Sequence, residues 1–271
     1  MNLLAAVSDD GSYKPPTIME FYPEVFLFEG TPFAINRIMM IRLIVVALLI
    51  LLFWLWTRKF NQAVKANNVV PGRFQLMGEL VLNFVRKSIA HEQLGEKEGE
   101  RFLPLLTTIF FTVFAMNITG IIPFANMPGT ALIGLPIVLA AAAYVTFIYA
   151  GIKRHGGKFF TNAAFPAGVP KPLYVLVTPI ELLGIFILRP ATLILRLLMN
   201  MIVGHLMLVL FFSATHFFFF YTDGLTKLFG VGTLTFGFAF TIFELVIATI
   251  QAYVFTLLTT VYIQLAMADE H

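Results

Sequence analysis

The sequence has no cysteine and few charged residues, which make up only 12% of its 271 positions. Without cysteine the chain forms neither disulfides nor thiolate-ligated iron–sulfur clusters, although this absence says little about its redox compartment. Soluble domains carry about 25% charged residues, whereas this chain is 59% hydrophobic and contains 30 phenylalanines. The composition therefore predicts a polytopic membrane protein.

The sequence also lacks the common signatures of catalytic chemistry. It contains no G-x-x-x-x-G-K-[ST] phosphate-binding loop, no H-E-x-x-H zinc motif and no G-x-S-x-G nucleophile elbow. No two histidines share one membrane layer in a way that would ligate a haem. We therefore expect no catalytic residue, no metal and no cofactor. The formal net charge of +3 fits the orientation of a membrane protein better than binding to nucleic acid.

Apolar segments account for most of the chain. Five of them are long enough to cross a bilayer as helices, at 38–56, 102–122, 131–152, 173–220 and 229–267. Apolar residues at helical spacing over 74–90 predict an additional amphipathic helix at the membrane interface. As helices, the last two spans would measure about 70 and 58 Å, against a hydrocarbon core of about 30 Å. We therefore expect an all-α polytopic membrane protein in which these two helices are strongly tilted.

The charges outside the spans indicate the orientation of the chain. Residues 1–36 form an acidic segment without the basic start of a cleaved signal, and we expect them on the extracytoplasmic side. Two loops, 57–73 and 153–172, carry groups of lysine and arginine, which predicts that both are cytoplasmic. About twelve of the 18 Lys and Arg residues would then lie inside, together with the C-terminus. Residues 37–271 are expected to form a single transmembrane domain.

The segment 178–212 is apolar almost throughout but contains ionisable side chains. Charges at bilayer depth cost about 3 kcal/mol each, so they face protein or water and mark ion or substrate paths. Arg196 and Asn200 share one helical face, and Arg189, two turns earlier, lies on it as well. His205, nine residues after Arg196, points to the opposite side. Arg189 has an alternative interpretation, in which its side chain reaches back to the membrane surface.

The last span contains a second group of polar residues. Glu244 and Gln251 are seven residues apart and share a helical face. A proton carrier needs groups that hold and release a proton, and Glu244 and His205 are titratable groups inside apolar segments. We therefore interpret them as parts of a proton path. The alternative is that Glu244 is a structural residue, hydrogen-bonded to a neighbouring helix.

Three motifs resemble those of subunit a of the F-type ATP synthase. They read RLLMNMIVGH at 196–205, ELVIATIQAYVFTLL at 244–258 and N-x-x-G-x-x-P at 117–123. The topology agrees with that family over roughly residues 35–267. Together the three motifs are far more specific than the first one alone.

The resemblance implies roles for particular residues. Arg196 would face a ring of c subunits, with Asn200 and Gln251 near it. His205 and Glu244 would lie in the outer half-channel. The further candidates for the lining of the half-channels are Glu181, Arg189, Asn117 and Tyr262.

For the whole chain the resemblance implies a proton-translocating stator subunit that performs no bond chemistry by itself. It would offer two offset half-channels to the rotating c-ring and couple proton flow to ATP synthesis, with protons favoured over sodium ions. The implied partners are the c-ring, b-type peripheral stalk subunits, indirectly the catalytic head, and the lipid of the inner (plasma) membrane. A proton-coupled secondary transporter and an intramembrane hydrolase are the alternatives, but the sequence shows no internal repeat and no nucleophile motif.

Overall fold

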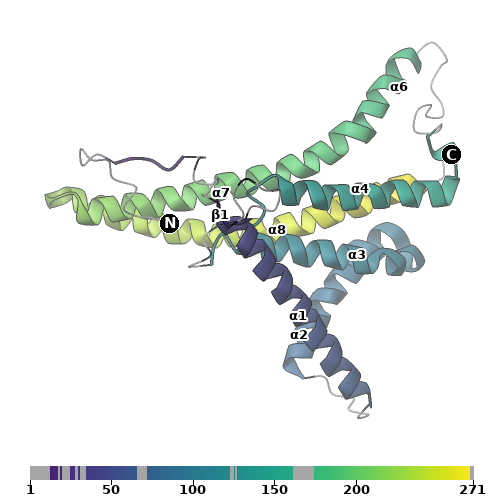
Figure 1. Ribbon diagram of the computed structural model, residues 1–271, viewed down its shortest axis with the longest axis horizontal. Coiled ribbons are helices and arrows are strands. Elements are labelled where there is room, and N and C mark those ends of the chain that lie inside the picture. The colour runs from purple at the N-terminus through teal and green to yellow at the C-terminus, as the bar shows by residue number, and fades with distance from the viewer. Residues whose placement is uncertain are drawn as a thin grey trace. The chain divides into compact units, whose positions relative to one another are not determined.

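The computed structural model describes residues 13–17, 19, 25–27, 30, 35–65, 72–122, 125, 127–160 and 174–268 (Figure 1). Among these residues five helical segments are long and apolar enough to cross a membrane. They are Arg37–Gln62, Gln75–Ile118, Gly134–His155, Leu176–Phe220 and Gly224–Met267. The predicted all-α fold with about five spanning helices is therefore confirmed.

A short antiparallel strand pair precedes the first helix. It consists of β1 (Val25–Leu27) and β2 (Ile35–Asn36), with Val25 opposite Asn36. These strands were not predicted from the sequence. Most of the acidic segment 1–36 and the last three residues of the chain lie outside the described residues, so their expected positions remain predictions.

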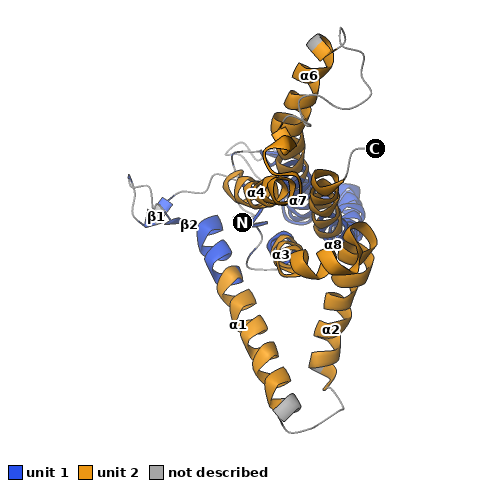
Figure 2. Cartoon of the chain, turned by 90° about the vertical axis from the view of Figure 1, so that its right-hand side faces the viewer, with its two compact units in different colours: residues 1–45, 114–132, 197–251 blue, residues 46–113, 133–196, 252–271 orange. Residues whose placement is uncertain are grey.

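The helices divide into two compact units (Figure 2). Unit 1 contains residues 1–45, 114–132 and 197–251, and unit 2 contains residues 46–113, 133–196 and 252–271. Both units contain parts of the same long helices, so they do not follow one another along the chain as successive domains would.

The first three helices contain the predicted interfacial helix and two of the predicted spans. After α1 (Arg37–Lys65), α2 (Arg73–Val85) continues through one π-helical turn, η3 (Arg86–His91), into α3 (Glu92–Ile118). The helix predicted over 74–90 is therefore joined to the second span without a loop. Whether it lies at the membrane interface stays a prediction.

The charged residues over 91–101, at the start of α3, have a structural role in unit 2. The chain changes direction at Gly95, whose φ of 75° is in the left-handed region that glycine adopts without strain. Beyond this bend, Oε1 of Glu100 lies 2.9 Å from both Nε of Arg86 and Nε2 of His91. The contacts of Glu100 therefore join α3 to the turn that ends α2.

The predicted fourth span is a continuous run of helix despite two internal prolines, Pro179 and Pro190. It consists of α6 (Tyr174–Leu183), a π-helical segment η5 (Gly184–Leu188) and α7 (Arg189–Phe220). A proline ring in a helix clashes with the carbonyl four residues earlier, which for Pro190 belongs to Phe186. The wider π-helical turn lies at this position, so the run passes Pro190 without a break.

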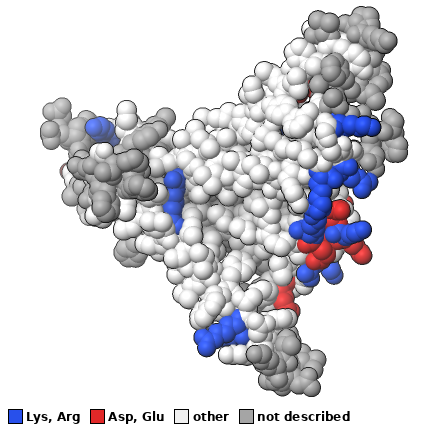
Figure 3. Space-filling view, turned by 45° about the vertical axis from the view of Figure 1, so that its right-hand side comes forward, with Lys and Arg blue, Asp and Glu red and all other residues white. Residues whose placement is uncertain are grey.

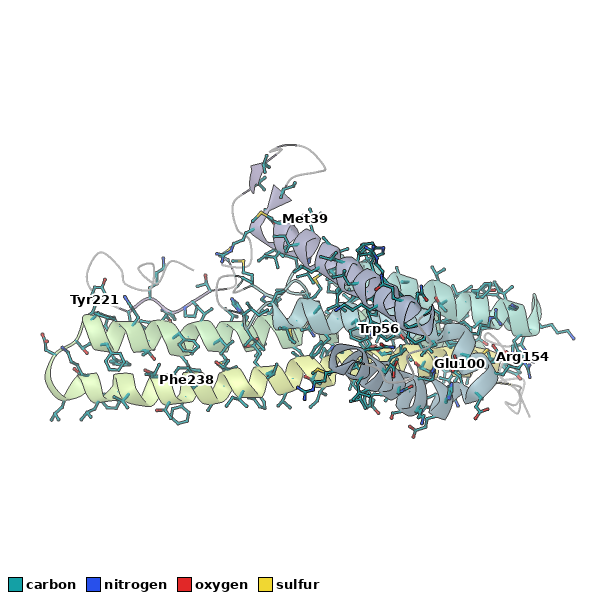
Figure 4. All side chains as sticks on the ribbon, turned by 90° about the horizontal axis from the view of Figure 1, so that it is seen from below. Met39, Trp56, Glu100, Arg154, Tyr221 and Phe238 are labelled. Carbon is teal, nitrogen blue, oxygen red and sulfur yellow. The ribbon has the colours of Figure 1, made fainter. Side chains whose placement is uncertain are left out.

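The last helix, α8 (Lys227–Met267), follows a 3₁₀ turn, η6 (Gly224–Thr226), and has 41 residues. Within unit 1 it pairs antiparallel with α7, as in Figure 4, where Tyr221 and Phe238 mark this hairpin. Thr215 Oγ1 donates to Thr233 Oγ1 at 2.9 Å near the closed end. The predicted tilt of the last two spans is consistent with their length but remains a prediction.

The helix α4 (Gly134–His155) packs beside α3 in unit 2. Nη2 of Arg101 on α3 donates to Oη of Tyr149 on α4 at 2.9 Å, and the ammonium of Lys153 lies 5.8 Å from the centre of the same ring. Glu100 and Arg154 lie at this same end of the two helices (Figure 4). Figure 3 shows that charged side chains gather in a few groups, separated by wide uncharged surface.

Candidate functional site

Arg196 lies on α7 with an exposed side chain. Large apolar neighbours on the same helix are also exposed: Leu195 by 49%, Met199 by 52% and Val203 by 54%. Within the described part of the chain, Arg196 takes part in no hydrogen bond or ion pair. A charge on an apolar surface at bilayer depth is costly, so this arrangement is suited to a partner that supplies an anion.

One turn after Arg196, Asn200 connects α7 to α8. Its Nδ2 donates a hydrogen bond of 2.8 Å to Oε1 of Gln251. Gln251 is only 3% exposed, and its Nε2 has no hydrogen-bond partner among the described residues. The amide pair therefore fixes the register of the two helices and retains one donor for water or for a bound group.

Glu244 is enclosed between the same two helices of unit 1, with 1% of its surface exposed. Its carboxyl faces Gly204, where an added Cβ would lie 3.2 Å from Oε1 and 3.4 Å from the carboxyl carbon. Neither oxygen of Glu244 has a hydrogen-bond partner in the described part of the chain. Buried polar atoms are almost always bonded to protein or to ordered water, so this carboxyl fits a hydrated path.

His205 follows Gly204 and is 4% exposed. Its ring forms a hydrogen bond with the backbone of Gly120, which follows the end of α3. The structure therefore brings His205 and Glu244 into one region of unit 1, but the two side chains share no direct hydrogen bond. A proton path through both groups would therefore need water between them.

Arg189 and Tyr262 come together in unit 2. The guanidinium carbon of Arg189 lies 5.9 Å from the ring centre of Phe147 and 5.6 Å from that of Tyr262. A cavity of about 10 Å³ beside them is also lined by Tyr144, whose buried hydroxyl has no partner among the described residues. Arg189 is half-buried, and its guanidinium lies over two aromatic rings. The alternative, in which the side chain reaches the membrane surface, did not include these ring contacts.

The other two candidates have different surroundings. Asn117 is fully buried at the end of α3, and its Oδ1 accepts a hydrogen bond of 2.6 Å from Thr130 Oγ1. This contact holds the loop after α3. Glu181 is half-buried on α6 and has no hydrogen bond or ion pair within the described ranges. The role of both residues as half-channel lining stays a prediction.

Gly204 and Tyr144 were not predicted from the sequence as functional residues. Gly204 has a signal in retrospect, because a glycine beside an intramembrane histidine indicates a close approach of another group. Tyr144 follows a run of alanines and has no such signal, since its importance depends on Arg189 and Tyr262, more than 40 positions later in the chain.

An exposed arginine on an apolar helix and an enclosed pair of titratable groups define a class of protein. The chain is a multi-pass membrane protein with ionisable side chains inside its apolar helices, a feature of proteins that move ions or substrates across membranes.

Comparisons with known proteins agree with this class. The family model described as "ATP synthase A chain" matches residues 39–264. An ATP synthase subunit a from Rhodococcus erythropolis is 48% identical, over 96% of this chain and 92% of its own length. Those from Paenarthrobacter aurescens and Streptomyces lividans are 36% and 35% identical, over 99% and 98% of both chains. The chain belongs to the ATP synthase A chain family, the proton-translocating stator subunits of the F-type ATP synthase.

Replacing Gly204 by valine tests whether the space in front of Glu244 matters. The added side chain meets the Glu244 carboxyl, so we expect ATP-driven proton pumping to fall about tenfold, because small displacements of reacting groups are costly. The measurement is acidification of inverted vesicles, normalised to the amount of assembled complex. Gly232→Val on α8 is the matched control, since nothing lies within 4 Å of a Cβ at Gly232. Equal pumping by the two variants would contradict the prediction.

Proposed function

We propose that this chain offers two offset half-channels to a ring of c subunits, so that protons crossing the membrane turn the ring and drive ATP synthesis. The observation that carries the proposal is the exposed Arg196, which has no anionic partner within the described part of its own chain. A carboxylate presented by a neighbouring subunit would satisfy it. The family shown by the comparisons supports the same assignment.

Arg196 would act as a fixed positive charge. Arginine does not release its proton in proteins, because its pKa exceeds about 12, so it is no proton relay. At about 4 Å and an effective dielectric constant of about 20, it would attract a ring carboxylate by about 4 kcal/mol. This energy favours the ionised carboxyl by roughly three powers of ten. The carboxyl would therefore lose its proton beside Arg196, and the same charge would keep the two half-channels separate.

The outer half-channel would use the enclosed groups of unit 1. His205 and Glu244 are the titratable groups there, and water between them would carry protons from the outer surface toward the ring. Asn200 and Gln251 would hold the α7–α8 register, and Gln251 would keep one amide donor for this water. Each proton that crosses gains about 2.3 kcal/mol per 100 mV of membrane potential, which the ring converts to rotation.

The inner half-channel would use polar groups of unit 2. Arg189 and Tyr262 lie together around a cavity of about 10 Å³ that Tyr144 also lines. Such a cavity holds roughly one water molecule. Glu181, half-buried on α6 without a partner among the described residues, would be a further group on this path.

The proposed location is the plasma membrane, with the N-terminus outside and the C-terminus in the cytoplasm. Positively charged loops favour the cytoplasmic side. In unit 2, Arg101 and Lys153 both contact Tyr149, and Arg154 lies at the same end of α4 (Figure 4). That end would therefore face the cytoplasm.

Purification from mild detergent tests the proposed partners. A tagged chain should bring down a c-ring and b-type stalk subunits in stoichiometric amounts, together with the catalytic head. A secondary transporter, the alternative function, would purify without them. Recovery of the chain alone, from membranes in which the c-ring is present and intact, would contradict the proposal.

A further inference from the structure

Arg42 is a cation inside the first apolar span whose hydrogen bonds go to a distant loop. It lies between Ile41 and Leu43 on α1 and is half-buried. Its Nε donates to the carbonyl oxygen of Gly129 at 2.7 Å, and its Nη2 donates to that of Leu132 at 2.9 Å. The guanidinium therefore holds two carbonyls of the loop between α3 and α4, all within unit 1.

The same loop is attached to the end of α3 by a second set of contacts. The amide of Gly129 donates to Met116 O at 2.9 Å and to Thr119 Oγ1 at 3.0 Å. Thr119 Oγ1 in turn donates to Met127 O at 3.0 Å. A side chain on Gly129 would collide with Met116, since its Cβ would lie 2.7 Å from the sulfur. The peptide held by Arg42 is thus packed directly on the last turn of α3.

From the last turn of α3 the contacts continue to His205. Gly120 packs against Pro128 so closely that an added Cβ would lie 3.1 Å from the proline Cβ. The amide of Gly120 is used in a turn, where it donates to Asn117 O at 3.1 Å. The backbone of Gly120 also forms the hydrogen bond with the His205 ring. The position of that ring therefore depends on where the loop holds Gly120.

We infer that Arg42 is a positioning residue of the outer half-channel: by holding the carbonyls of Gly129 and Leu132, it fixes the loop whose Gly120 backbone orients the His205 imidazole. Hydrogen bonding at one ring nitrogen determines which nitrogen faces the proton path. The inference rests on the proposed role of His205, and it adds to that role a residue on a different helix that touches neither His205 nor the reacting proton.

To hold the carbonyls of Gly129 and Leu132 together, residue 42 needs two N–H donors in a fixed arrangement, which arginine has and lysine lacks. A guanidinium presents several N–H groups in a rigid plane, whereas an ammonium is a single point charge on a flexible stem. Arg42→Lys would keep the charge and reach one carbonyl, whereas Arg42→Gln would lose the charge. The two variants therefore separate the effect of the fork from the effect of the charge.

The test measures ATP-driven proton pumping by the whole complex over a series of pH values on the His205 side. We expect Arg42→Gln to lower pumping about tenfold, as misplacement of a reacting group does. We also expect the midpoint of its pH profile to shift, because the His205 ring would lose its hydrogen bond with Gly120. Arg42→Lys should show a smaller change of the same kind. Arg58→Gln, at the other end of α1 with its cation over Trp54, is the control and should match the unmodified complex.

The pH profile separates positioning from assembly. A variant that only reduces the amount of complex lowers the rate equally at every pH and leaves the midpoint unchanged, which would overturn the inference. The other charged groups near His205, Arg37 and Glu244, are the same in all of these variants. If Arg42→Gln does not assemble, Arg42→Lys decides, and failure of both to assemble would also overturn the inference.

A His205→Leu variant in the same series distinguishes this inference from the proposed function. Normal pumping by His205→Leu would remove the histidine from the path and end both proposals together. If His205→Leu pumps poorly but the Arg42 variants keep the midpoint of the pH profile unchanged, only the role assigned to Arg42 would be refuted.

Discussion

Membranes that contain Arg196→Ala are expected to make no ATP from a proton gradient, although the complex is assembled. The exposed guanidinium contributes no hydrogen bond or ion pair to its own described chain, so its loss leaves the fold intact. The expected loss of function is large because a c-ring carboxyl would lose about 4 kcal/mol of attraction beside the stator. The carboxyl would then keep its proton, and rotation would deliver none to the second half-channel.

Lysine at the same position should largely fail as well. An ammonium keeps the charge of Arg196 in water, but it releases a proton far more readily than a guanidinium when it is desolvated. It would therefore become a relay between the half-channels instead of a fixed charge. The measurement is ATP synthesis in membrane vesicles energised by a proton gradient, with Arg58→Ala as a control that removes an exposed cation elsewhere. Normal rates in Arg196→Ala would refute the role assigned to this residue.

The number of spanning helices could be predicted from the sequence, because it depends only on the length of apolar runs. How the helices join could not be predicted. Proline alone would have suggested a break at Pro190, but a π-helical segment lies where its ring would clash with the carbonyl of Phe186. Likewise, the join between α2 and α3 depends on a bend at Gly95 and on the contacts of Glu100 with two residues of the preceding turn.

The sequence predicted which site residues share a face of one helix, but it could not predict the contacts between helices. Spacing alone gave Arg196 and His205 different faces, and the structure agrees, because one is exposed and the other is buried. Spacing could not show that Gly204 makes room for Glu244, since that contact depends on the register of α7 and α8, 40 positions apart. It could not show the contacts of Arg42 either, because they join α1 to a loop 87 and 90 positions later.

Single replacements of His205 or Glu244 by leucine are expected to slow proton pumping by about a hundredfold, as the loss of a general acid or base does. Both groups are buried, and the Glu244 carboxyl has no hydrogen-bond partner among the described residues. Leucine fills a similar volume but cannot hold a proton or bind the connecting water. Arg196 would still separate the half-channels, so the variants should pump slowly without becoming leaky to protons.

The exchanged variant, His205→Glu combined with Glu244→His, should recover part of the lost pumping. The chemistry of the path requires one imidazole and one carboxyl joined by water, and the exchange keeps both groups within the same enclosed region of α7 and α8. Recovery would be incomplete because residue 244 packs closely on Gly204, where an added Cβ would lie 3.2 Å from the Glu244 carboxyl, and because the Gly120 backbone contacts a ring at 205. The measurement is pumping in inverted vesicles between about pH 6 and 9, the range in which such groups titrate, with proton leak recorded in parallel. Full pumping in both single variants would leave His205 and Glu244 as structural polar contacts, and equal loss in the exchanged variant would show that their positions matter more than their chemistry.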